Sequence, residues 1–501
     1  MPSPFRIYNT LSRQSEDFVP ISEGKVSLYF CGMTVYDHCH VGHARAMVTS
    51  DMVARYLRHR GWDVEFVRNY TDVDDKIIRR AAESGEEPLA FAERFIQSTQ
   101  EDFAALGLVK PTHEPRVSTS MDEIVEIIGR LVERGHAYES EGSVWFDVGT
   151  FPEYGKLSRQ KVEELRQPDE AVPGKRAPVD FAVWKAAKDG EISWPSPWGK
   201  GRPGWHIECS AMAYKHFGPQ IDIHGGGLDL VFPHHENEIA QSEAAHDHGP
   251  YAKYWMHNGM LTMESGQKMG KSLGNVFGIK EALKLFPAEA MRIYYQQVHY
   301  RSPLPWNVEA LPGALSLLAR LYEARDAAAE MGGEEKLQNV ARDLGKDAQT
   351  VVELAESFSE RFYAAMDDDF NTGKAIGLAL ELARAVNRLS NHKKAKKRGG
   401  PIAKLAIEAF GVLRDALGLL ELSGEQFAEE VKDKRLPSMG LTREDVDAKL
   451  AARVAARAAK EWAQADAIRA ELEATGIQVM DRPDRVDWRI RLDVRDEASE
   501  E

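Results

Sequence analysis

The stretch that decides the fold runs from residue 24 to residue 68. Residues 24–32 read GKVSLYFCG, in which apolar side chains alternate toward a glycine, as in a strand that ends in a turn. Residues 44–59 carry apolar side chains at helical spacing, and Gly61 marks the end of this helix. Residues 63–68 read DVEFVR, the next strand. Strand, helix and strand in this order predict a βαβ unit of a doubly wound parallel sheet, with its ligand crevice at the carboxyl ends of the strands.

The rest of the chain divides by pattern into further regions. The α/β pattern returns at residues 221–227 (IDIHGGG), followed by a helix through residue 245 with Pro233 at its expected first position. Residues 121–200 have a looser pattern, with a short helix, a strand at 143–147 and much Pro and Trp, and we interpret them as an insertion in the sheet domain. Residues 312–422 carry apolar residues at helical spacing and predict a helix bundle. A capping box at residues 442–445 opens a helix expected to run to residue 472, before a short strand at 477–480.

Composition limits the class of protein. The 501 residues are 43% hydrophobic and 29% charged, as in ordinary soluble proteins, and exceed what one core usually holds. No stretch approaches the roughly 20 apolar residues of a membrane helix, and the polar first residues do not form a secretory signal. Three cysteines do not make a disulfide framework, so we expect a cytosolic protein.

Charge distribution leaves RNA binding open. A net charge of −15 argues against a protein that coats nucleic acid by bulk attraction, although a local basic patch can still bind RNA. One basic run, residues 393–398 (KKAKKR), is expected in a loop. It is either a solvated linker or an RNA contact, because charge runs are often only solvated.

Four residues form a candidate metal site. Cys31 and Cys209, both expected at strand ends, would converge with His234 and Glu238, which share a helix face at i and i+4. Thiolate, imidazole and carboxylate are the ligands that zinc accepts in a tetrahedral site. Taken singly, each cysteine is as readily a small core residue. Cys39, between two histidines, is interpreted as a core thiol.

Two further motifs could contact phosphates. His40 and His43 lie between a strand and a helix, where a triphosphate could sit on backbone N–H groups and the helix dipole, although capping histidines would look the same. Lys268 and Lys271, three residues apart in a segment with several glycines, could reach an α-phosphate as negative charge develops on it. An exposed turn is the alternative for this segment.

Together these motifs resemble the class I aminoacyl-tRNA synthetases, and within them the cysteinyl-tRNA synthetase family. The carrying sequences are FCGMTVYDHCHVGH (30–43), FVRNYTDVDDKIIRRA (66–81), GWHIECSAMA (204–213), IDIHGGGLDLVFPHHENEIAQSE (221–243), MHNGMLTMESGQKMGKSLGN (256–275) and DDDFNT (367–372). The HIGH signature stands at residues 40–43 and the KMSKS signature at residues 268–272, where Gly270 replaces the serine. The resemblance covers nearly the whole chain.

The resemblance implies an enzyme, a ligase, that activates cysteine with ATP and Mg²⁺ and transfers it to the terminal ribose of tRNA(Cys), releasing pyrophosphate and AMP. It implies one zinc per chain, held by Cys31, Cys209, His234 and Glu238, that binds the substrate thiol. Zinc deprotonates a thiol, giving a soft bond that a serine hydroxyl cannot match. A site built around such a contact needs no editing domain.

The resemblance also assigns roles to individual residues. His40 and His43 would bind the triphosphate of ATP, and Lys268 and Lys271 would stabilise the transition state. The substrate cysteine would contact Thr71, Trp205, His224 and Asp229. The anticodon would contact Arg457, Trp462, Asp466 and Asp481, types suited to base edges and stacking; the alternative is a charged helix with Trp462 as a packing anchor. Residues 485–487 (RVD) depart from the usual Gly-Thr pattern.

In these terms we divide the chain into six parts and expect a monomer without a membrane anchor. The parts are a Rossmann-type catalytic domain (1–120 and 201–250), a connective insertion (121–200), a KMSKS-loop and stem-contact region (251–311), a helical tRNA-binding bundle (312–425), a small mixed anticodon domain (426–495) and a disordered acidic tail (496–501). Two rivals remain: the related ligase of mycothiol synthesis, which attaches cysteine to an amino sugar and lacks a full anticodon region, and a tRNA-binding or zinc-structural protein with a dead active site.

Overall fold

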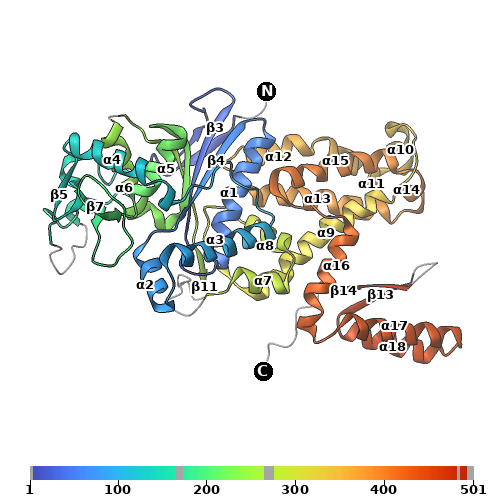
Figure 1. Cartoon of the computed structure of the whole chain (residues 1–501). Coiled ribbons are helices and arrows are strands. Elements are labelled where there is room, and N and C mark those ends of the chain that lie inside the picture. Colours follow the sequence, from blue (N-terminus) through green and yellow to red (C-terminus); the bar gives the residue numbers. More distant parts are fainter. Residues whose placement is uncertain (1–3, 165–172, 247, 264–275, 482–485, 493–501) are drawn as a thin grey trace.

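A four-stranded parallel sheet organises the first half of the chain in the computed structural model (Figure 1). The structure describes residues 4–164, 173–246, 248–263, 276–481 and 486–492. In the order β10-β9-β3-β4, the strands are β10 (Ala252–Asn258), β9 (Ile221–Gly227), β3 (Lys25–Thr34) and β4 (Asp63–Thr71). The predicted α/β class and parallel sheet are confirmed.

Strand β3 is central and buried on both faces, because its alternating side chains enter two different cores. Val26, Leu28 and Phe30 pack with α1 (Val41–His59) and the helical half of the molecule. Tyr29 and Cys31 pack on the opposite face with α4 (Met121–Glu133), α5 (Ile207–Phe217) and α6 (Glu236–His246). This two-sided burial is typical of parallel sheets covered by helices.

The carboxyl end of β3 is irregular. Its register against β4 shifts between Phe30 and Met33, which marks a bulge next to Cys31. Gly32 is required there, since a Cβ atom would lie 1.6 Å from the Asn69 carbonyl oxygen. The bulge therefore lets two backbones meet closely just where β3 delivers Cys31.

The inserted region forms its own antiparallel sheet beside α4. Its strands, in order, are β5 (Ala137–Ser140), β6 (Ser143–Phe146), β7 (Phe181–Ala186) and β8 (Gly201–Pro203). The strand predicted at 143–147 is confirmed as β6, one residue shorter. The other elements of this half are β1 (Arg6–Asn9), β2 (Gln14–Asp17), α2 (Asp75–Ser84), α3 (Pro88–Ala105), β11 (Leu261–Met263), α7 (Ile279–Leu285), α8 (Ala288–Gln296) and β12 (Leu304–Trp306).

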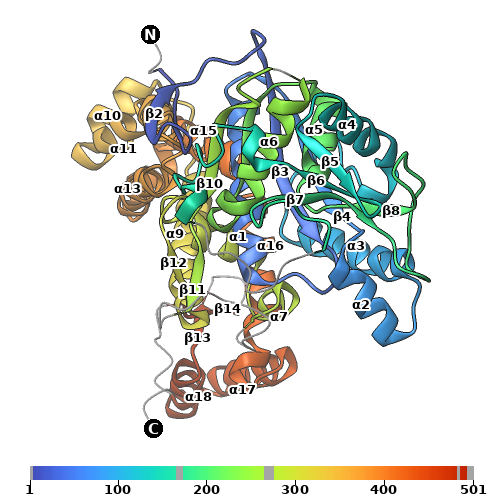
Figure 2. The ribbon, with the colours of Figure 1, turned by 90° about the vertical axis from the view of Figure 1, so that its left-hand side faces the viewer.

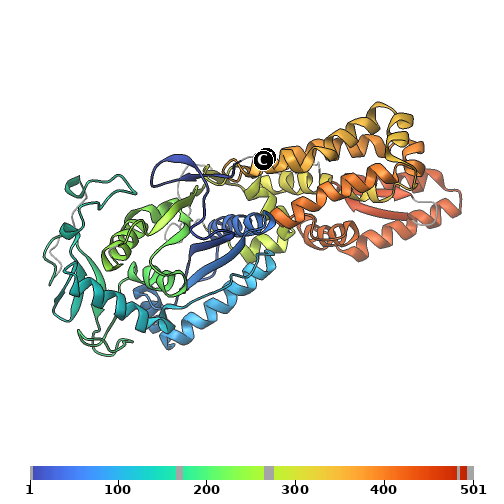
Figure 3. The same ribbon diagram turned by 90° about the horizontal axis from the view of Figure 1, so that it is seen from above.

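A helical region extends away from the sheet, as Figure 3 shows from above. Its helices are α9 (Leu311–Ala329), α10 (Leu337–Leu344), α11 (Lys346–Glu356), α12 (Phe358–Met366), α13 (Thr372–Ser390), α14 (Lys393–Arg398) and α15 (Gly400–Leu417). The predicted loop at 393–398 is wrong, because these residues form α14. Ala395 is buried, and Arg398 forms ion pairs with Glu335 and Asp343.

The carboxyl-terminal elements form a small body that packs on α7 and α9 (Figures 1 and 2). They are α16 (Gly424–Arg435), α17 (Arg443–Ala458), α18 (Trp462–Ala474), β13 (Ile477–Asp481) and β14 (Val486–Ile490). The capping box of Thr442 and Asp445 is confirmed. The single helix expected through residue 472 is wrong: the chain breaks between α17 and α18, where Lys460 takes a positive φ of 62°.

Within the described ranges, none of the helices has both the length and the apolar character that spanning a bilayer requires.

Candidate active site

The four candidate ligands come from four elements at the carboxyl end of the sheet. Cys31 lies on β3 and Glu238 on α6, as expected. Cys209 was expected at a strand end, which is wrong: it lies in the first turn of α5. Pro233 was expected to begin the following helix, but it lies with His234 in a π-helical turn (Val231–His235) that precedes α6.

The distances between the ligand atoms suit a tetrahedral metal. The Cys31 and Cys209 sulfurs are 3.8 Å apart, and His234 Nε2 is 3.0 Å from Glu238 Oε1. One atom from each of the four buried residues lies within 4.8 Å of the other three. Two sulfurs, each about 2.3 Å from a tetrahedral zinc, would be about 3.8 Å apart. The residues present therefore fit a zinc ion.

Hydrogen bonds and charges couple the protonation of these four side chains. The hydrogen bond with Cys31 lowers the pKa of Cys209 to about 6, and His234 acts in the same direction. Burial would raise the pKa of Glu238, but His224 and His234 hold it well below its usual range. Burial raises the pKa of the Cys31 thiol. Burial alone would lower the pKa of His234, but the charge of Glu238 raises it to about 10. A metal ion that binds all four residues would therefore displace protons from Cys31 and His234.

Neighbouring histidines surround the four ligands. His224, on β9, approaches Glu238 Oε2 at 2.8 Å through Nε2, and His235 Nε2 lies 3.2 Å from the Cys31 sulfur. With Cys31 and Glu238 these two histidines form a second set whose atoms lie within 4.8 Å. That set offers one thiol where the first offers two. His235 also contacts His257 through Nδ1 at 2.8 Å, which orients its ring.

Sequence reasoning missed His235 and His257. The signal for His235 was available, because it precedes Glu238 by three residues and so shares its helical face. His257 gives no such signal: it lies on β10 and meets His235 only through the pairing of β10 with β9.

Two of the four residues assigned to the substrate cysteine, Trp205 and His224, contact this cluster. The Trp205 ring stacks on His234 at 4.2 Å between centroids and stays 37% exposed, so it forms an outer wall. Thr71, at the end of β4, donates to buried Glu208 at 2.9 Å. Asp229 lines a cavity of about 530 Å³ together with His257. The structure thus places Trp205 and His224 against the predicted metal ligands, and Asp229 beside a neighbouring cavity.

His40 and His43 lie at the amino end of α1. Nδ1 of His40 accepts from the backbone N–H groups of Gly42 and His43, at 3.1 and 3.3 Å, and the two imidazoles stack 3.6 Å apart. The N–H groups are therefore capped rather than open. Because His40 caps the helix, α1 begins three residues before the predicted start. A Cβ atom at residue 42 would lie 2.9 Å from Cε1 of His40, so a larger residue there would displace the His40 ring.

Lys268 and Lys271 lie outside the described residues. The segment that carries them follows β11, and the structure describes the chain again from Val276 onward. Val41 donates its backbone N–H to the Phe277 carbonyl at 3.0 Å, and Gly278 forms a bridge with His40. The chain after the lysine segment is therefore attached directly to the histidine motif.

The four anticodon candidates lie in the carboxyl-terminal body. Among the described residues, two of the four contact each other. Arg457 pairs with Asp481 at 2.9 Å. Trp462 is 58% exposed at the start of α18, so its interpretation as a packing anchor is wrong. Asp466 lies exposed on the same helix. Sequence reasoning missed Arg453, which is buried and holds Asp481 through two bonds of 2.8 Å.

Comparisons with known proteins agree with this arrangement. Residues 17–316 match the family model of the class I (C) tRNA synthetase catalytic domain, 361–421 the DALR domain, and 441–489 the cysteinyl-tRNA ligase anticodon binding domain. The chain is 47% identical over 492 residues to the cysteine–tRNA ligase of Geobacter metallireducens, covering 97% of this chain and 99% of the relative. The chain belongs to the cysteine–tRNA ligase family. A second family member, from Alkalilimnicola ehrlichii, is 50% identical over 486 residues, covering 96% of this chain and 99% of the relative.

Solved structures confirm the fold beyond the cysteine–tRNA ligase family. Methionyl-tRNA synthetase from Mycobacterium tuberculosis, bound by methionyl-adenylate, is similar with a TM-score of 0.60 at 14% identity. The similarity covers 84% of this chain and 95% of that one. The class I synthetase fold predicted from the motifs is confirmed.

Proposed function

We propose that the protein is a cysteine–tRNA ligase that selects cysteine with a zinc ion, activates it with ATP and transfers it to tRNA(Cys). The observation that carries this proposal is the buried set of two thiols, an imidazole and a carboxylate, within 4.8 Å of one another. Membership of the family supports the same activity.

Selection would begin at Cys31, Cys209, His234 and Glu238. When bound there, zinc supplies a soft Lewis acid that favours a thiolate over a hydroxyl. The chain's own residues supply the shape: Trp205 walls the site over His234, and His224 orients Glu238. Asp229, across the adjacent cavity, would bind the substrate amino group by charge.

Activation would take place at the amino end of α1. The carboxylate of cysteine attacks the α-phosphorus of ATP, the bond to pyrophosphate breaks, and Mg²⁺ accompanies the nucleotide. Phosphate oxygens would replace the His40 nitrogen as acceptors for the N–H groups of Gly42 and His43, assisted by the helix dipole. Lys268 and Lys271 would then stabilise the charge that develops on the α-phosphate. The attachment of Gly278 to His40 supports this pairing of the two motifs.

Transfer to tRNA would use the rest of the chain. We assign residues 1–120 and 201–250 to catalysis, 121–200 to a connective insertion, 251–311 to the lysine segment and the tRNA stem, 312–425 to tRNA binding and 426–495 to the anticodon. The exposed Trp462 offers a stacking surface for an unpaired base, and Asp466 an acceptor for base edges. A full anticodon domain favours tRNA over a small amino sugar as the acceptor.

Amino-acid-dependent ATP–pyrophosphate exchange, without tRNA, tests this proposal. The purified protein, with its metal retained, is assayed with cysteine, serine and each other amino acid. We expect exchange with cysteine alone, and subsequent charging of tRNA(Cys). Absence of exchange with every amino acid would contradict the proposed activity.

A further inference from the structure

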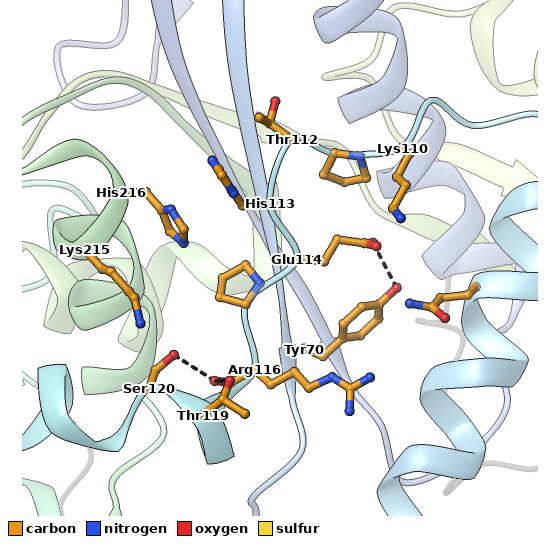
Figure 4. Close-up of a pocket in the computed structure, with 13 residues that line it drawn as sticks. Tyr70, Lys110, Thr112, His113, Glu114, Arg116, Thr119, Ser120, Lys215 and His216 are labelled. Atoms are coloured by element: carbon orange, nitrogen blue, oxygen red, sulfur yellow. Dashed lines mark hydrogen bonds between the residues drawn. The ribbon is translucent and has the colours of Figure 1, made fainter.

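We propose that Glu65, His113 and His216 form a second divalent-metal site, separate from the thiol-containing site and open to a neighbouring cavity. Figure 4 shows His113 and His216 side by side at the edge of that cavity. The site shares no residue with Cys31, Cys209, His234 and Glu238.

The three side chains already lie at coordinating range. His113 Nε2 is 3.1 Å from Glu65 Oε1, and the rings of His113 and His216 stack with centroids 4.3 Å apart. One donor atom from each of the three residues lies within 4.8 Å of the others. Ligand atoms about 2.0–2.2 Å from a tetrahedral metal are roughly 3.3–3.6 Å apart. The rings of His113 and His216, which stack at an interplanar angle of 20°, would rotate out of this arrangement to direct both nitrogens at one metal.

The backbone beneath these side chains is held in place. Glu65 lies on β4, and His113 lies on the loop that pairs with this strand. His113 donates its N–H to the Phe66 carbonyl at 3.2 Å, and its own carbonyl accepts from Arg68 at 3.1 Å. His216 lies in the last turn of α5. Three rigid elements therefore fix the donor positions, as a preorganised metal site requires.

The local electrostatics allow a cation. The carboxyl end of α5 presents its negative dipole end beside His216. Lys215, the adjacent cation, pairs with Glu123 at 2.5 Å.

The donor set defines the metal class. Two imidazoles and one carboxylate, without thiolate, suit Zn²⁺, Ni²⁺ or Cu²⁺ and leave a fourth position open. His113 and His216 line a cavity of about 500 Å³, which Lys110, Arg116 and Ser120 also line. A water or a small anion could complete the coordination there. Because it lacks thiolates, this site should bind zinc more weakly than the first.

Calorimetric titration tests the site in the full-length protein. Zn²⁺ is titrated into protein that already carries one tightly held zinc per chain after dialysis. In the parent protein we expect one additional zinc-binding event. The double variant H113A/H216A loses two of the three ligands, so the affinity of this event should be at least about a hundredfold weaker there. Glu65→Gln, which keeps the side-chain size, should weaken binding without removing the imidazoles.

The matched control is His392→Ala, because His392 also pairs with a carboxylate, Asp347 at 3.1 Å, but belongs to no three-residue donor group in the described part of the chain. This control should keep the additional event unchanged. Electron paramagnetic resonance of Cu²⁺ bound at the second site should show coupling to two nitrogens, lost in H113A/H216A. Equal zinc affinity of H113A/H216A and the parent protein, or no event beyond the first zinc, would overturn the proposal.

Discussion

The histidine cap on α1 predicts that Gly42→Ala separates stability from activity. A Cβ atom at residue 42 would lie 2.9 Å from Cε1 and 3.0 Å from Nδ1 of His40. Since carbon contacts are comfortable at about 3.5–4.0 Å, the His40 ring must move by roughly 0.5–1 Å. The ring is a side chain and can move, but then its bonds to the two backbone N–H groups weaken.

Two opposing terms set the stability of this variant. Loss of a helix cap costs about 0.5–2 kcal/mol. Replacing a helical glycine by alanine returns up to about 1 kcal/mol. The change in the free energy of unfolding should therefore lie between a gain of about 0.5 kcal/mol and a loss of about 2 kcal/mol. Activity should respond more strongly, because a misplacement of about 1 Å in a positioning group can reduce a rate by about 10².

The assay compares cysteine-dependent ATP–pyrophosphate exchange with thermal unfolding in the same preparations. Gly377→Ala is the matched control: Gly377 lies exposed in α13, and a Cβ there meets nothing within 4 Å. We expect the control to keep full exchange activity with equal or greater stability. Full exchange activity in Gly42→Ala would refute the role given to the His40 ring.

Three further predictions follow from the other assigned residues. Lys271→Ala should reduce exchange by about 10² or more while leaving the metal content unchanged, as expected for loss of one stabilising donor; an unchanged rate would refute its role. Asp466→Ala should weaken charging of tRNA yet preserve cysteine activation, and equal loss of both would contradict an anticodon contact. Arg453, with Arg457, lowers the pKa of Asp481 to about 2, below the roughly 3.9 of an unfolded carboxyl. The stabilisation that this ion pair gives to the folded state is fully present above about pH 4 and is lost as the pH falls toward 2. Asp481→Asn should therefore make unfolding of the carboxyl-terminal body less sensitive to acid. Identical acid profiles of the variant and the parent protein would count against this ion pair.

Much of the catalytic half could be predicted from sequence, because its signals are local. The alternation in residues 24–32 marks β3, and the glycines after residue 223 mark the end of β9. The expected convergence at the carboxyl ends of parallel strands correctly brought Cys31 toward His234 and Glu238. Cys209 lies in the same cluster but belongs to the first turn of a helix, and the rule for the ends of parallel strands could not predict that position.

The errors have physical reasons. No glycine or proline marks the break between α17 and α18, because Lys460 itself takes the left-handed conformation. The basic run of α14 lacks apolar periodicity, and its helix is supported by buried Ala395 and the ion pairs of Arg398. Arg453 was missed because a single arginine in a charged helix gives no signal until β13 brings Asp481 beside it.

The central claim is that the protein recognises its substrate through a metal held by Cys31, Cys209, His234 and Glu238. Cobalt replaces the native metal, and the thiolate-to-cobalt absorption is followed as cysteine or serine is added in the absence of ATP. The account predicts that cysteine increases this absorption, because a further thiolate joins the metal, and that serine leaves it unchanged. Identical spectra with cysteine and serine, in protein that still activates cysteine, would contradict it.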